Sequence, residues 1–159
     1  MYEIGENIVY PMHGAGTIIS IEEKEILGKI EQYYVVKVPT SEIKLMVPVS
    51  TAEVVGVRKI IDETTLKKAL KQISLTPDES NTNWNKRYRE HLQKLKTGDI
   101  VQVGTVVKNL LQRESHHVLS TCEKQMLNNA MQIMTSEISL TRNLPSEQIE
   151  SELTEFFSI

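Results

Sequence analysis

The side chains best suited to chemistry lie in residues 81–96, around the single tryptophan of the sequence, Trp84. An indole has a large flat face that can stack on another aromatic ring, including a nucleobase. Five basic residues follow it against one acid, Glu90, and their cationic groups can pair with phosphate; they are Lys86, Arg87, Arg89, Lys94 and Lys96. The segment therefore predicts a locally basic surface that carries an aromatic side chain at one end.

The spacing within this segment predicts a helix that stops near residues 97–98. At about 100° per residue, the basic residues spread over one side of that helix, and the opposite face holds Trp84, Tyr88, His91, Leu92 and Leu95. This phase favours a buried Trp84, because large aromatic residues on an apolar stripe usually pack in the core. The neighbouring polar residues instead indicate a helix start, where an indole can project into solvent; they are Asn81, Thr82, Asn83 and Asn85.

No other cluster of residues predicts catalysis, a cofactor or a metal. His116 and His117 are adjacent, which is a poor spacing for one tetrahedral site, and Cys122 has no CxxC partner. Residues 13–16 (HGAG) lack the GxGxxG and GK[ST] patterns and precede a predicted strand, whereas a phosphate loop leads into a helix. A nucleophile elbow and a paired acid and base are also missing. We therefore expect no enzyme, no bound metal and no cofactor.

The composition indicates a soluble globular protein with one ordinary domain or two small ones. Its 159 residues are 40% hydrophobic and 25% charged, and the net charge of -3 argues against a protein that coats nucleic acid by bulk attraction. No apolar run reaches the roughly 20 residues that cross a bilayer, and the first residues lack a secretory pattern. The single cysteine excludes an internal disulfide and fits a reducing compartment. We expect a cytoplasmic protein with no membrane partner.

Residues 1–60 predict a small β domain and residues 61–159 a helical domain, so the expected fold class is α+β. In the first domain, runs rich in β-branched and aromatic residues alternate with turn-forming residues. The expected strands are residues 7–10, 17–21, 32–38, 42–48 and 54–57, with turns at 11–16 and 27–29. About five short strands with small connections are typical of an SH3-like or Tudor-like barrel.

The alternation in the fourth expected strand predicts a surface for docking. If Ile43, Leu45 and Val47 face inward, the residues between them face outward, and these are Lys44, Met46 and Pro48. A proline confines the strand to an edge of the sheet, and an outward methionine offers an adaptable apolar contact beside unpaired backbone. The alternative is an exposed methionine in an ordinary sheet.

Residues 61–159 predict five amphipathic helices joined by short links. The first is expected to end at Ile73. Capping residues indicate where the helices begin: at Asp62, at the polar residues before Trp84, at Thr97, at a capping box of Ser120 and Glu123, and at Pro145.

Short segments spread over nearly the whole chain carry a family pattern: residues 5–14 (GENIVYPMHG), 47–48, 55–58 (VGVR), 82–88 (TNWNKRY), 95–99 (LKTGD), 119–120 and 123–127 (EKQML). Each is weak alone, but their order and spacing argue against a chance match. Together they resemble the CarD/CdnL family of bacterial RNA polymerase-binding transcription regulators.

This resemblance implies an N-terminal Tudor-like domain that docks on the β-subunit lobe of RNA polymerase. It also implies that the helical domain contacts promoter DNA at the upstream edge of the transcription bubble, largely without reading its sequence. Trp84 would wedge into the minor groove beside the melted base pairs, which overrides the core interpretation of that residue. Lys86, Arg87 and Arg89 would hold nearby phosphates.

The resemblance further implies that the strand with Lys44, Met46 and Pro48 contacts the polymerase, together with Lys24. Some family members have arginine in place of Met46, so an apolar contact is expected there instead of a salt bridge. Such a protein would stabilise the open promoter complex as a monomer and reach the nucleoid through the polymerase.

Two other kinds of protein fit parts of the sequence. A sequence-specific repressor could use two consecutive helices as a helix-turn-helix, and Gly98 near their link is compatible with that motif. A structural scaffold would instead bury Trp84. Footprinting without polymerase separates the repressor from the polymerase-bound regulator, and quenching of the Trp84 fluorescence by a solvent-borne quencher separates the scaffold.

Overall fold

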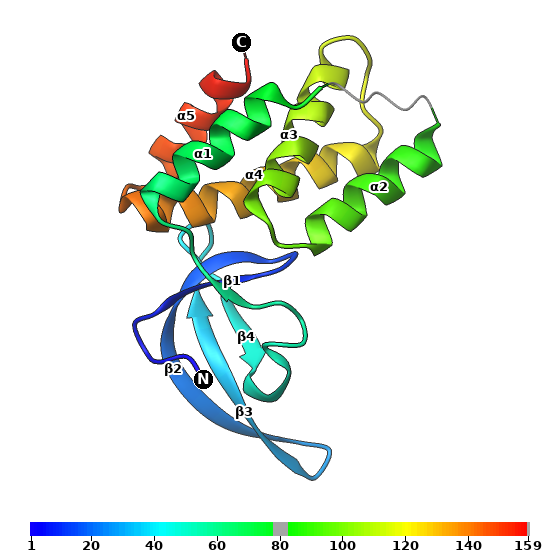
Figure 1. The fold of residues 1–159 in the computed structure, drawn as a ribbon. Helices are drawn as coiled ribbons and strands as arrows, with labels where there is room; N and C mark the ends of the chain where they lie inside the picture. Colours follow the sequence, from blue (N-terminus) through cyan, green and yellow to red (C-terminus); the bar gives the residue numbers. More distant parts are fainter. Residues whose placement is uncertain (78–82, 159) are drawn as a thin grey trace.

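An antiparallel β sheet lies beside a bundle of helices (Figure 1), which is the expected arrangement of a Tudor-like domain followed by a helical domain. This computed structural model describes residues 1–77 and 83–158. Asn81 and Thr82, two of the polar residues before Trp84, lie outside the described residues.

The sheet has the strand order β4-β3-β2-β1-β5 within the described residues, so β4 and β5 are its edges. Its elements are β1 (Asn7–Tyr10), β2 (Gly14–Ile26), β3 (Lys29–Lys37), β4 (Lys44–Pro48), a 3-10 turn η1 (Val49–Thr51) and β5 (Arg58–Lys59). The predicted fifth strand at residues 54–57 is wrong. Those residues form a turn in which Val54 is 86% exposed, and the strand that pairs with β1 comes immediately after it.

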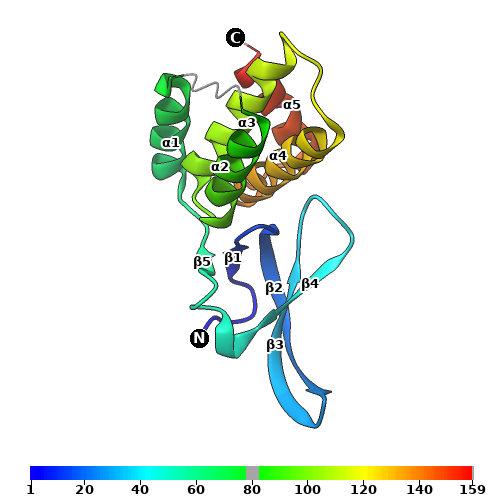
Figure 2. The same cartoon turned by 90° about the vertical axis from the view of Figure 1, so that its right-hand side faces the viewer.

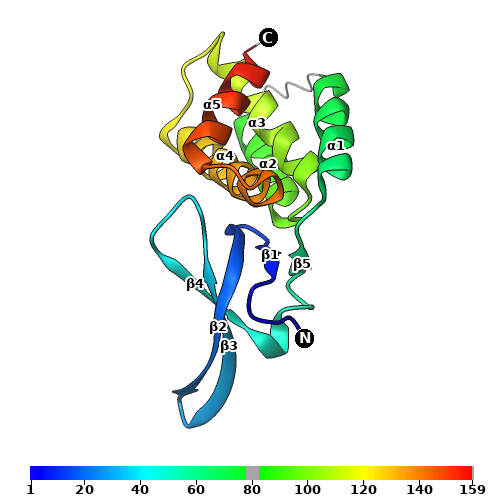
Figure 3. The same ribbon diagram turned by 90° about the vertical axis from the view of Figure 1, so that its left-hand side faces the viewer.

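A long hairpin of β2 and β3 projects away from the helices (Figures 1 and 3). Its two strands are joined by Leu27 and Gly28, which have φ values of 53° and 79°. Two consecutive residues with positive φ form the tight turn whose twist matches that of the flanking strands. The turn predicted at residues 27–29 is therefore confirmed.

The inner face of the sheet is apolar and includes Ile8, Ile18, Tyr34, Val36 and Val47. Leu45 packs against this cluster, as the alternation in β4 predicted. The inward placement predicted for Ile43 is wrong, because the residue precedes β4 and its side chain is 73% exposed.

The helices are α1 (Glu63–Leu75), α2 (Trp84–Lys96), α3 (Ile100–Glu114), α4 (Thr121–Arg142) and α5 (Ser146–Phe157). Asp62 and Ser120 are the N-caps of α1 and α4, as predicted. The predicted cap of α3 is wrong: Thr97 has helical backbone angles and ends α2, and the carboxylate of Asp99 accepts the hydrogen bond that starts α3. An aspartate carboxylate is at least as good an N-cap acceptor as a threonine hydroxyl, so the sequence offered two possible N-caps for α3, two residues apart.

The sheet and the helices are in direct contact where α4 packs against the start of β2 (Figures 2 and 3). The Ala15 N–H donates to the hydroxyl of Ser136 at 2.8 Å, and both residues are buried. The neighbouring Gly14 has a φ of 109°, and a Cβ there would stand 2.9 Å from the same hydroxyl oxygen. Only a glycine therefore allows the β1–β2 turn to approach α4 so closely.

Candidate nucleic-acid interface

The first turn of α2 holds Trp84 at the surface of the helical domain. Asn83 is the N-cap, and its side-chain oxygen accepts from the Lys86 N–H at 3.2 Å. Because Trp84 is the first residue of the helix, only part of its ring is covered by neighbouring turns, and 40% of the residue is exposed. The burial favoured by helical phase alone is therefore not observed.

Two contacts fix the orientation of the exposed ring. The indole stacks on Tyr88, one turn further along α2, with ring centroids 5.3 Å apart and planes 14° apart. Its Nε1–H donates to the Ser120 hydroxyl at 3.3 Å, across from α2 to the start of α4. The ring is thus solvent-accessible and held in place at the same time.

Arg87 is buried, which argues against its predicted contact with phosphate. The residue is 4% exposed, and its Nε and Nη2 donate to the two carboxylate oxygens of Glu123 at 3.1 and 2.9 Å. Glu123 is itself 2% exposed, and its hydrogen bond with Arg87 lowers the pKa of the carboxyl group. The pair joins α2 to α4 in the interior and is unavailable to DNA.

The position of Arg87 follows from the phase of the helix. Arg87, His91 and Leu95 are four residues apart and form the buried side of α2. The sequence placed His91 and Leu95 on the inner face but assigned Arg87 to the outside because of its charge. The signal that was missed is the acid at the fourth position of the α4 capping box: Glu123 does not return to cap the helix but pairs with Arg87.

His91 is buried between these charges in a neutral state. Burial lowers its pKa to about 4, and the positive charge of Lys94 acts in the same direction. Its Nδ1 has no hydrogen-bond partner among the described residues. The residue therefore adds no positive charge to the surface of α2 near neutral pH.

Lys86 and Arg89 are exposed cations of α2, and the helical phase puts them on the side of the helix away from Trp84. Together with Glu90, Gln93 and Lys94 they line a shallow open groove on the outer side of the helix. Sequence reasoning missed Lys124, which is exposed on α4 one turn beyond Ser120. Both helices that meet at the indole therefore carry exposed cations that can pair with phosphate.

The four residues predicted to contact a protein partner share one face of the sheet. In the antiparallel register, Lys44, Met46 and Pro48 lie opposite alternate residues of β3, and these are Lys37, Val35 and Tyr33. Lys24 of β2 lies opposite Glu31, which continues the same alternation. This face is opposite the apolar inner face, and β4 pairs only with β3 among the described strands, so its outer backbone edge is open.

Neither a metal cluster nor a membrane span occurs in the described part of the chain. Groups of three or more His, Cys, Asp or Glu that could hold an ion are absent there. His116, His117 and Cys122 are each exposed. No helix in residues 1–77 and 83–158 is both long and apolar enough to cross a bilayer.

Comparison with known proteins assigns both halves of the chain to one family. Residues 2–61 match the model of the CarD-like/TRCF RID domain, and residues 68–154 match the CarD C-terminal domain. A curated relative from Bacillus subtilis (strain 168), named "Putative transcription factor YdeB", is 36% identical over 151 residues, which cover 95% of this chain and 99% of the relative. The chain belongs to the CarD family.

In this CarD-family chain, the two candidate surfaces lie in different matched regions. The face that carries Lys24, Lys44, Met46 and Pro48 (the β4 face) falls within the RID match, and Trp84 with the exposed cations of α2 falls within the C-terminal match. The family is one of transcription factors.

Proposed function

We propose that the protein binds the β subunit of RNA polymerase through the β4 face and stabilises the open promoter complex by inserting Trp84 at the upstream edge of the transcription bubble. The observation that carries this proposal is a 40% exposed indole at the start of a helix that also carries exposed Lys86 and Arg89. The match of residues 2–61 to an RID domain supports the polymerase as the docking partner.

The energy available from the indole suits this role. Opening a promoter interrupts base stacking, and an aromatic ring set against the last paired bases replaces part of it. Stacking of a base on an aromatic side chain contributes about 1–3 kcal/mol. Because each 1.4 kcal/mol corresponds to about a tenfold change in an equilibrium constant, one ring is enough to shift a nearly balanced opening equilibrium.

The cations provide binding that does not depend on base sequence. Lys86 and Arg89 are exposed and can each neutralise a phosphate, whereas Arg87 is committed to Glu123. Two or three phosphate contacts on a protein of net charge -3 are too few to find promoters unaided. Docking on the polymerase supplies the location, because tethering raises the effective concentration of the ring at the bubble edge.

The β4 face is suited to an apolar contact, and the open edge of β4 can also pair its backbone with a strand of the partner. Met46 and Pro48 are half-buried on the open edge of the sheet, and Lys44 is exposed beside them. A strand of the partner can add to this edge through main-chain hydrogen bonds, with Met46 supplying an adaptable apolar surface. Lys24, further along the same face, extends the contact toward the β2–β3 hairpin.

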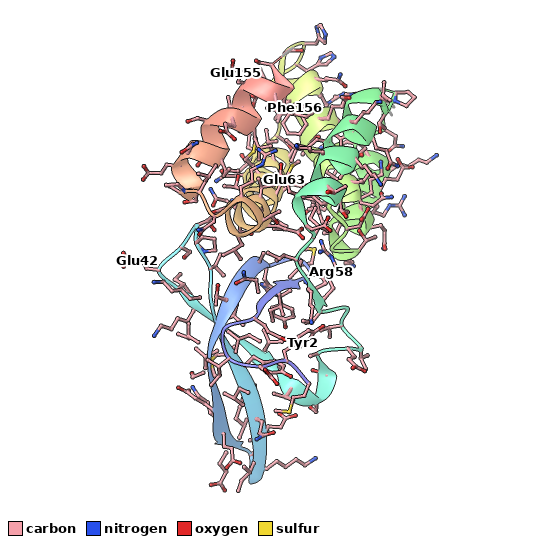
Figure 4. All side chains as sticks on the ribbon, turned by 60° about the vertical axis from the view of Figure 1, so that its left-hand side comes forward. Tyr2, Glu42, Arg58, Glu63, Glu155 and Phe156 are labelled. Carbon is pink, nitrogen blue, oxygen red and sulfur yellow. The ribbon has the colours of Figure 1, made fainter. Side chains whose placement is uncertain are left out.

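The lifetime of open complexes formed by purified polymerase tests the proposal. Trp84→Ala is expected to remove most of the stabilisation given by the parent protein, a loss of about tenfold in lifetime for one stacked ring. Phe156→Ala is the matched control, because Phe156 is also a partly exposed aromatic residue of the helical domain but lies on α5 (Figure 4). A folded Trp84→Ala variant that matches the parent would show that the ring is not the active element.

A footprint without polymerase tests the alternative. A specific operator protected by the protein alone would favour a helix-turn-helix repressor over a polymerase-tethered factor. We expect protection only when the polymerase is present.

A further inference from the structure

The Ser120 hydroxyl lies where the indole of Trp84 meets the rest of the protein. Its oxygen accepts two hydrogen bonds, one from the Glu123 N–H at 3.2 Å and one from the indole Nε1–H of Trp84 at 3.3 Å. The first is an ordinary N-cap of α4. The second connects residues 36 positions apart in the sequence and has no role in capping.

The buried pair beneath the ring keeps this hydroxyl in position. Arg87 of α2 and Glu123 of α4 are both less than 5% exposed and are joined by two hydrogen bonds. Glu123 is also the residue whose N–H is capped by Ser120, so the start of α4 is fixed relative to α2 at two adjacent points. The Ser120 oxygen is thereby held within reach of a side chain in the first turn of α2.

The ring is left with little freedom but retains an accessible surface. One face stacks on Tyr88, and the N–H edge is bound to Ser120. Even so, 40% of Trp84 is exposed. A side chain that is already ordered loses less conformational entropy when it binds, so its affinity for the same partner is higher.

We propose that Ser120 is a positioning residue that holds the Trp84 ring in its binding orientation before DNA arrives. The Arg87–Glu123 pair is the support that sets the position of Ser120. This inference rests on the proposed function for its consequence at the promoter. Its structural part, the restraint of the indole, is testable on the free protein.

Fluorescence of the free protein measures the restraint directly, because Trp84 is the only tryptophan. In Ser120→Ala, the fast local component of the fluorescence anisotropy decay should increase, because the ring has lost one of its two contacts. Ser120→Thr keeps a hydroxyl and an N-cap, so it should restore most of the slow decay. Asp62→Ala is the matched control: it removes the N-cap of α1 and leaves both contacts of the indole in place.

Open-complex lifetime measures the consequence at the promoter. A net hydrogen bond of ordinary strength corresponds to a change of about two- to tenfold, so Ser120→Ala should shorten the lifetime by that factor. Ser120→Thr should recover it, and Asp62→Ala should leave it unchanged. The Asp62→Ala control separates positioning from a general loss of stability, since a merely destabilised helical domain would shorten the lifetime in that variant as well.

Each outcome decides between the two proposals. If Trp84→Ala shortens the lifetime but Ser120→Ala leaves it at the parent value, positioning by Ser120 is overturned and the proposed function stands. If neither substitution changes the lifetime, the proposed function itself fails. An unchanged anisotropy decay in Ser120→Ala shows that the hydroxyl does not restrain the ring, and a longer lifetime shows that the contact opposes insertion; either result overturns the inference.

Discussion

Arg58 and Glu137 form a two-point ion pair that joins the β sheet to the helical domain. Nη1 and Nη2 of Arg58 donate to the two carboxylate oxygens of Glu137 at 2.7 and 2.8 Å. The guanidinium also donates to the Gly98 carbonyl, and the carboxylate accepts from the Ile61 N–H at 3.0 Å. One pair therefore ties together β5, the β5–α1 link, the α2–α3 link and α4.

The first prediction concerns this pair. Arg58→Ala should lower the free energy of unfolding by about 3 kcal/mol, because it leaves the nearly buried Glu137 carboxylate without its cation. Glu137→Gln in the same background should recover part of the loss by removing the unpaired charge. Urea unfolding of the parent, the single variant and the double variant measures these free energies. Equal unfolding midpoints would show that the pair contributes nothing to stability.

The same substitution should also weaken the effect on open complexes. In the proposed function the β4 face and Trp84 contact different partners, so a loosened junction would spread the ring over more positions and lower its effective concentration at the bubble edge. The lifetime measured with a saturating amount of Arg58→Ala checks this expectation. A lifetime equal to that of the parent protein would mean that the junction need not be rigid.

The second prediction separates Arg87 from its basic neighbours. Arg87→Ala should destabilise the protein by about 3–5 kcal/mol, because Glu123 would remain buried without a partner. A double change to Arg87→Met and Glu123→Leu should be close to neutral, since apolar residues of similar size replace both charges. Thermal and urea unfolding compare the stability of the parent and the two variants. An Arg87→Ala variant as stable as the parent would show that the buried pair does not stabilise the fold.

The third prediction concerns the phosphate contacts. Lys86→Ala and Arg89→Ala should each reduce the slope of log affinity against log salt concentration by about one for DNA binding by the polymerase-bound protein. Neither should alter the preference among promoter sequences. Lys67→Ala with Lys68→Ala is the charge-matched control, because both lysines are exposed on α1. An equal effect of the control pair would indicate bulk attraction and not a local site.

The fourth prediction concerns stability in mild acid. The folded pKa of His91 is lowered from 6.5 to about 4, so the unfolded chain takes up a proton at this residue first as the pH falls. Its contribution to stability is full above about pH 6.5 and is lost progressively down to about pH 4, by up to about 3 kcal/mol. The lowered pKa of Glu123 acts with the same sign at lower pH, because a paired carboxylate loses its stabilising effect when it is protonated.

His91→Leu isolates this contribution, because leucine fills a similar space and does not titrate. Between pH 6.5 and pH 4, the unfolding free energy of the parent should fall relative to that of the variant as the pH falls. Parallel curves over that range would show that His91 titrates normally in the folded protein.

The fifth prediction concerns docking on the polymerase. Met46→Glu places a charge on the β4 face and should abolish retention of the protein by immobilised polymerase, because the carboxylate must be desolvated in an apolar contact. Val54→Glu adds the same charge to the same domain at a residue that is 86% exposed and outside β4, and it should bind normally. Retention of Met46→Glu at the parent level would place the docking surface elsewhere.

Local features of the fold could be predicted from the sequence because their causes are local. The bounds of α2, the N-caps Asp62 and Ser120 and the turn at Leu27 and Gly28 follow from periodicity, side-chain acceptors and glycine. Errors occurred where neighbours competed, as at Thr97 and Asp99.

The sequence by itself determined that Trp84 begins a basic helix and that β4 is an edge strand, because both depend on residues close together in the chain. Only the tertiary structure decided which charges are free. Arg87 carries the same charge as Lys86, yet the packing of α4 against α2 brings Glu123 to it and removes it from the surface. The same packing brings Ser120 to the indole. These contacts span 36 residues, and no local pattern specifies them, because they depend on how one helix rotates and slides against another.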